Sequence, residues 1–170
     1  MPPQLFDQIA SSWDIAALDV PLLRQVHDYW LSKRVGAALP LRSAIEPTEI
    51  PLLLPHLFLV EVLQPGPPMR LRMRLAGTAF RHFFGFDLTG QEMSEDDPRL
   101  DRAQFCAEWR EVLERRAPRW ARVRQQAGAA PVGQEEGITA IRFTGLVLPL
   151  SRDGTAADML LGATVYDPVE

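Results

Sequence analysis

The sequence has little cysteine and little histidine, and this scarcity excludes two kinds of stabilising site. Among its 170 residues there is one cysteine, Cys106, and there are three histidines. A single thiol cannot close a disulfide within the chain, and so few cysteine and histidine side chains make a structural zinc site improbable. We therefore predict no metal site and a reducing, cytoplasmic environment.

The sequence also lacks an excess of positive charge. Its 18 basic and 22 acidic residues give a formal net charge of −4. Non-specific binding to nucleic acids or anionic membranes relies on a broad positive field, so neither partner is expected. The alternating arginines of the segment Met69–Leu75 are better explained as a solvated strand face than as a nucleic-acid-binding stripe.

No hydrophobic run is long enough to cross a membrane. The longest apolar-rich stretch, Ile50–Leu63, contains two prolines, His56 and Glu61, and is shorter than the roughly 20 residues of a spanning helix. The segment Met1–Ile15 carries acidic side chains and no basic region, unlike a secretory signal. The sequence thus predicts a protein that does not cross a bilayer.

The motifs of common enzyme classes are missing as well. There is no His-Glu-x-x-His, Gly-x-Ser-x-Gly, phosphate-binding loop or dinucleotide fingerprint. The glycines of Gly85–Gly90 follow an expected helix rather than a strand, so we interpret this segment as a turn. A general base at Asp87 or Asp158 is chemically conceivable, but nothing in the spacing selects it. We predict no catalytic residues.

Apolar residues make up 46% of the sequence, which is enough for one hydrophobic core. They recur with the spacings that are typical of helices and of strands. The expected helices cover about 21–35, 79–84 and 101–117, with a short helical turn near 46–50. The expected strands cover about 57–63, 69–75, 119–124, 138–150 and 159–166. Residues 1–18 are expected to form a loosely ordered lead-in to a single domain over 19–170.

Two strands, intervening helices and three further strands predict one antiparallel sheet, which places the chain in the α+β class. If the chain builds back toward the first strand, the last strand, 159–166, lies beside 57–63 in the centre of the sheet. Both are apolar at successive positions, which is typical of central strands. The strands at 69–75 and 119–124, which alternate with arginine, then form charged edges.

Several segments together resemble the PAS domains, and in particular a bacterial subfamily of about this length that occurs as a stand-alone protein. They are Trp30 with Arg34 and Gly36, Leu39–Arg42, Leu53–Leu59, Arg72–Thr78, Phe84–Gly90, Leu148–Gly154 and Leu160–Gly162. The most specific part is the succession of a strand, Gly77-Thr78, a short helix and the turn at 87–90. The resemblance implies a PAS-like five-stranded antiparallel sheet with helices on one face and an N-terminal helix packing on the other.

The resemblance also implies a sensory or protein-interaction module whose sheet and short helices can enclose a small ligand. The expected cavity lining consists of apolar residues from the second strand, the short helix and the longer helix: Met69, Leu71, Met73, Leu75, Phe80, Phe83, Phe84 and Trp109. The alternative is that these side chains fill one another's space, as in an ordinary core. Met69 and Met73 are adaptable enough to allow a small induced cavity.

No cofactor is predicted, although an unidentified small molecule is compatible with such a cavity. A flavin photosensor of the PAS type needs a reactive cysteine in an Asn-Cys-Arg-type motif, and the surroundings of Cys106, Gln104–Glu108, lack it. A haem sensor needs an axial ligand, for which His82 is the only reasonable candidate. No second ligand accompanies it, so we interpret His82 as a surface or interface histidine.

Members of the PAS family commonly dimerise through the helix before the first strand, so we expect a homodimer. The candidate interface residues are Leu22, Val26, Tyr29 and Trp30, with packing inside the chain as the alternative. The sequence thus predicts a sensory or regulatory module without catalysis that contacts an unidentified signalling protein. The alternative function is a small-molecule-binding enzyme or carrier on a similar curved sheet, which a polar, pH-sensitive cavity residue would favour.

Overall fold

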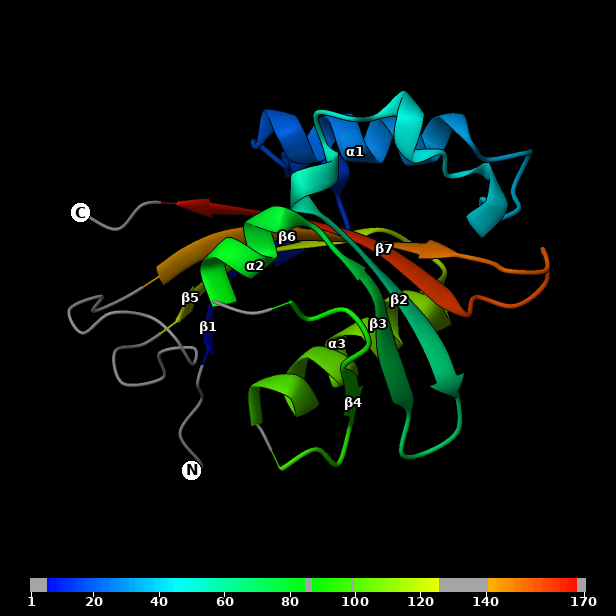
Figure 1. The fold of residues 1–170 in the computed structure, drawn as a ribbon. Helices are drawn as coiled ribbons and strands as arrows, with labels where there is room; N and C mark the ends of the chain where they lie inside the picture. The colour runs from blue at the N-terminus through cyan, green and yellow to red at the C-terminus, as the bar shows by residue number, and fades with distance from the viewer. Residues whose placement is uncertain (1–5, 85–86, 99, 126–140, 168–170) are drawn as a thin grey trace.

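The computed structural model describes residues 6–84, 87–98, 100–125 and 141–167, which form helices and strands (Figure 1). The helices are α1 (Pro21–Ser32), α2 (Thr78–Phe84) and α3 (Leu100–Arg115), with short 3-10 helices η1 (Ile15–Ala17), η2 (Arg42–Ala44), η3 (Pro47–Glu49) and η4 (Leu54–His56). The strands are β1 (Phe6–Ser12), β2 (Leu57–Gln64), β3 (Arg70–Ala76), β4 (Glu92–Ser94), β5 (Arg119–Gln125), β6 (Ile141–Leu150) and β7 (Met159–Asp167). No helix within these ranges is long and apolar enough to cross a membrane.

In the described part of the chain, seven strands form one antiparallel sheet in the order β1-β5-β6-β7-β2-β3-β4. The last strand, β7, pairs with β2 from Leu57↔Ala163 to Glu61↔Met159. This pairing confirms the predicted central pair, and the mixture of one sheet with separate helices confirms the α+β class. The other expected helices and strands agree with the observed ones to within a few residues at each end.

The two ends of the sheet differ from the prediction. Strand β1 pairs with β5 from Phe6↔Gln125 to Ser12↔Trp120, and β4 pairs with β3 over three residues. The prediction of five strands with β3 and β5 at the edges is therefore wrong. Residues 6–12, which were expected to belong to a loosely ordered lead-in, form a strand, whereas residues 1–5 of that lead-in lie outside the described ranges. Both added strands are joined to the sheet by backbone pairing with distant strands, which a local residue pattern does not reveal.

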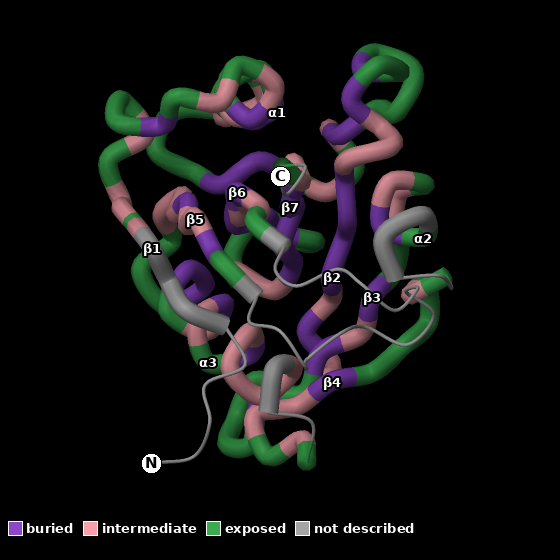
Figure 2. The backbone as a smooth tube through the Cα atoms, turned by 90° about the vertical axis from the view of Figure 1, so that its left-hand side faces the viewer, coloured by how far each residue is buried: buried purple, intermediate pink, exposed green. Residues whose placement is uncertain are grey.

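Each face of the sheet carries its own hydrophobic core, because successive side chains of a strand point to opposite faces. Leu57 and Leu59 of β2 join the outer core, which lies around Trp30 and packs against α1 and the connector 39–53. Phe58 and Val60 join the inner core, which packs against α2 and α3. Figure 1 shows α1 and α3 on opposite sides of the sheet, and Figure 2 shows buried backbone along β2, β6 and β7 between them. The predicted placement of the helices is thus confirmed.

Candidate functional site

The predicted ligand cavity corresponds to the inner core, between the sheet and helices α2 and α3. Five of the expected lining residues pack in this core: Met69, Leu71, Met73, Phe80 and Trp109. All five are buried and belong to one cluster. Phe83 and Phe84 lie in α2, but their side chains fall outside the described residues, as does that of His82. The described side chains of this group pack together in one buried cluster.

Phe58 occupies the centre of this core and was missed by the sequence analysis. Its ring stacks on Trp109 with centroids 5.4 Å apart and meets Phe80 edge-on at 5.3 Å. It has room to do so because its cross-strand partner is Gly162, which has no side chain to compete for the space. The aromatic residue in the apolar run of β2 and the glycine in β7 were the available signals, but only the pairing of the two strands connects them.

Leu75 does not join the other residues that were expected to line the cavity. Along β3, Met73 pairs with Val60 and Leu75 pairs with Leu59, so that Arg74 is an extra residue in the ladder. A bulge of this kind shifts the inward and outward alternation by one position. Leu75 consequently lies on the outer face, where its residue surface is 38% exposed. The prediction that it shares a face with Met73 is wrong.

Cys106 is fully buried in the inner core, and this burial raises the pKa of its thiol to about 12. Because the thiolate is the reactive species, we expect the native protein to react with Ellman's reagent at about pH 8 roughly 100-fold more slowly than the urea-unfolded chain. The absorbance of the released thionitrobenzoate measures the rate at which this one thiol reacts. Equal rates in the two states would show that α3 readily separates from the sheet.

The candidate dimer residues of α1 divide into two groups. Val26 and Trp30 are buried in the chain's own outer core, and the Nε1–H of Trp30 donates a hydrogen bond of 2.9 Å to the carbonyl of Pro149. Leu22 and Tyr29 are half-buried at the edge of that core. Trp30 therefore has the intramolecular packing role that the sequence left as an alternative.

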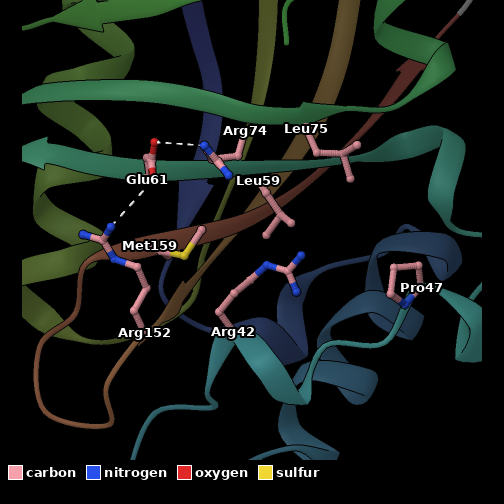
Figure 3. Close-up of a pocket in the computed structure, with 8 residues that line it drawn as sticks. All are labelled: Arg42, Pro47, Leu59, Glu61, Arg74, Leu75, Arg152 and Met159. Carbon is pink, nitrogen blue, oxygen red and sulfur yellow. Dashed lines mark ion pairs between the residues drawn. The ribbon is translucent and has the colours of Figure 1, made fainter. Parts of the chain in front are cut away.

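The outer face of the sheet contains a pocket of about 430 Å³ (Figure 3). Its lining combines η2 and η3 with strands β2, β3 and β7 and with the turn that precedes β7. The lining residues are Arg42, Pro47, Leu59, Glu61, Arg74, Leu75, Arg152 and Met159. Among them only Leu75 was a predicted site residue, and it was assigned to the opposite face. The pocket brings together residues that are far apart in the sequence.

Glu61 is the one acidic residue of this lining, and its side chain is only 12% exposed. Nη1 of Arg74 lies 3.6 Å from its Oε1, and Nη1 of Arg152 lies 3.6 Å from its Oε2. Figure 3 shows these two arginines approaching Glu61 from different sides, whereas Arg42 extends into the pocket from η2. Arg42 forms no ion pair with any residue of the described ranges; its Nη1 donates to a backbone carbonyl 3.2 Å away.

The carboxylates that were considered as general bases are held in turns. The backbone N–H and the hydroxyl of Thr89 hold the pKa of Asp87 below its ordinary value, opposite to the shift a general base needs. Asp158 accepts hydrogen bonds of 2.9 and 3.0 Å from the backbone N–H and Nε of Arg152. Within the part of the chain that is described, no three histidine, cysteine or acidic side chains are grouped as metal ligands.

Comparison of this chain with models of known protein families identifies one match. The PAS domain model matches residues 18–165. Similar solved structures include a variant of the fungal photoreceptor VVD (14% identity over 82% of this chain and 92% of that chain, TM-score 0.45). Another is an RNA-binding light-oxygen-voltage receptor (13% identity, 77% of this chain, TM-score 0.43), of which this chain spans only 36%. No curated protein matches significantly. Because the family match covers most of its length, this chain belongs to the PAS domain family, a family of sensory and regulatory domains.

Proposed function

We propose that this chain is a cytoplasmic regulatory module that acts through contacts with other proteins, catalyses no reaction and carries no cofactor against the inner face of its sheet. The observation that supports this best is the inner core, where the rings of Phe58, Phe80 and Trp109 pack against one another between the sheet and the helices. An output that does not depend on cofactor chemistry has to be a change in binding. The single cysteine supports a reducing compartment.

We further propose a homodimer that uses the exposed side of α1. Val26 and Trp30 are already buried inside the chain, so a partner would contact the remaining surface of this helix. Leu31 is 50% exposed, and Val35, just beyond the helix, is 83% exposed. Large apolar side chains exposed to solvent are a common feature of protein interaction surfaces. This supports a self-contact at the C-terminal end of α1.

Native mass spectrometry of freshly purified protein, followed by denaturing mass spectrometry, tests both parts of the proposal. We expect the mass of two chains and no added mass of a flavin or haem, because aromatic side chains pack together in the inner core. A discrete extra mass that disappears on denaturation, together with an absorbance band of a flavin or haem, would contradict the proposal of an inner face without a cofactor.

The interface is tested by replacing Leu31 and Val35 together with glutamate and measuring the molar mass by light scattering. We expect a folded monomer, because two charges cannot be buried in an apolar contact without partners. Leu52→Glu is a matched control, since Leu52 is also highly exposed but lies in the connector before β2. A dimer that persists in the double variant would exclude this end of α1 as the interface.

A further inference from the structure

The outer-face pocket combines arginines with an apolar floor, and nothing in the proposed function uses it. We propose that this pocket binds a small organic anion, a carboxylate or phosphate group attached to an apolar body. It lies on the opposite side of the sheet from the inner core, so the proposal does not depend on the inner face. It also does not depend on a dimer, and either proposal can fail without the other.

The charge of the lining selects an anion. Three arginines, Arg42, Arg74 and Arg152, face one acidic residue, Glu61, which leaves the lining with a net charge of +2. Guanidinium groups stay protonated at all physiological pH values, and their planar donors match the oxygens of carboxylates and phosphates. An amine of the same size would be repelled by the same residues.

Glu61 does not satisfy these arginines. The guanidinium nitrogens of Arg74 and Arg152 each lie 3.6 Å from a carboxylate oxygen of Glu61. For comparison, the ion pair between Nη2 of Arg70 in β3 and Oε2 of Glu92 in β4 is 2.7 Å long. A charge-assisted hydrogen bond is usually about 2.7–2.9 Å long. One carboxylate shared at these longer distances leaves guanidinium N–H donors available to a second anion in the pocket.

Arg42 and Arg74 are the residues best placed to bind that anion. Arg152 is held in position by Asp158, 3.0 Å from its Nε, and by the carbonyl of Val62, 3.2 Å from its Nη2. Arg42 instead extends into the pocket without an acidic partner among the described residues (Figure 3). Within the described ranges, the ion pair of Arg74 is its long contact with Glu61, and its side chain is about half exposed. We assign ligand binding to Arg42 and Arg74 and positioning to Arg152.

The rest of the lining requires an apolar body on the ligand. Leu59, Leu75 and Met159 line the pocket beside the arginines. Leu75 is present because the bulge at Arg74 turns it to the outer face, where it stays partly exposed. The volume of about 430 Å³ falls in the range of small-molecule sites, about 300–1,000 Å³. A bare inorganic anion would leave the partly exposed side chain of Leu75 in contact with water.

Isothermal titration calorimetry of the full chain with sodium octanoate tests this site. Octylamine keeps the tail and reverses the charge, and acetate keeps the headgroup and removes the tail. We expect octanoate to bind, acetate to bind at least about tenfold more weakly because it lacks the buried methylene groups, and octylamine to give no binding heat. Octyl phosphate identifies the preferred headgroup: tighter binding than octanoate assigns a phosphate, and weaker binding assigns a carboxylate.

Variants separate a binding role from a purely structural one. We expect Arg42→Gln and Arg74→Gln each to weaken octanoate binding about tenfold, and replacement of the exposed Arg124 of β5, Arg124→Gln, to leave it unchanged. Glu61→Gln removes the anion that competes for the arginines, so octanoate should bind about tenfold more tightly. A structural ion-pair network alone would give no such increase.

Methyl NMR on the unmodified chain locates the ligand without relying on any variant. Met159 lines the pocket, whereas Met69 and Met73 are buried in the inner core. Octanoate should shift the Met159 methyl signal and leave the other two unchanged. Three results would overturn the proposal: no octanoate binding at millimolar concentration, binding that is unaffected by both arginine replacements, or shifts at Met69 and Met73 without one at Met159.

Discussion

Trp30→Ala is expected to lower the free energy of unfolding by about 3–5 kcal/mol, the usual cost of truncating a buried tryptophan. Trp30 is buried in the outer core, donates to the Pro149 carbonyl and lies under the guanidinium of Arg34, 5.2 Å from its ring. Since a whole domain is stabilised by only about 5–15 kcal/mol, the loss is a large part of the total. Urea denaturation followed by circular dichroism measures it.

Leu52→Ala is the control, because Leu52 is also a large apolar residue but is 88% exposed and lies outside α1 and the proposed interface. Its cost should stay within about 0.5 kcal/mol, as for most surface substitutions. If Trp30→Ala cost no more than this, Trp30 would not be part of the core. Because Trp30 is buried, Trp30→Glu would place an unpaired charge in the core and unfold the chain, and the dimer is therefore tested at the exposed Leu31 and Val35.

Gly162→Ala should reduce the free energy of unfolding by about 3 kcal/mol, at the upper end of the usual cost of overpacking. The new Cβ would lie 1.9 Å from Cζ of Phe58 and 2.3 Å from both of its Cε atoms. The ring cannot move aside freely, because Phe80 and Trp109 enclose it. Differential scanning calorimetry of the original chain and of the variant measures the unfolding temperature and enthalpy of each, from which the change in the free energy of unfolding follows.

Gly145→Ala provides the control on the adjacent strand β6, because the nearest atoms to its new Cβ lie at an ordinary 3.8 Å. We expect its effect to stay below about 1 kcal/mol. A second test combines Gly162→Ala with Phe58→Leu, which shortens the ring that causes the clash. The double variant should be more stable than the sum of the two single effects predicts. Strict additivity would show that Phe58 and Gly162 do not compete for space.

Much of the fold could be predicted because the central strands carry strong local signals. The continuous apolar runs of β2 and β7 indicate burial on both faces, and the structure places them side by side. Strand β4 has only three residues, too few to show a period. Strand β1 contains polar residues and is placed by pairing with β5, more than 100 residues later in the chain. Such long-range backbone pairing leaves no local trace.

The candidate site was less predictable, for a related reason. Alternation correctly grouped Met69, Leu71 and Met73, but the bulge that redirects Leu75 depends on the register with β2. The arginines of β3 were interpreted as a solvated face, and the sequence gives no sign that Glu61 and Arg152 meet Arg74 in one pocket. A site assembled from separate segments requires the tertiary structure.

The pairing of β1 with β5 also affects where this protein can safely be shortened. The PAS match begins at residue 18, so a boundary drawn from sequence similarity alone would remove β1. Strand β5 would then expose a row of unpaired backbone N–H and C=O groups, which readily recruit a strand from another molecule. Self-association of such a shortened chain would arise from the cut edge, and it would be easily mistaken for a native dimer.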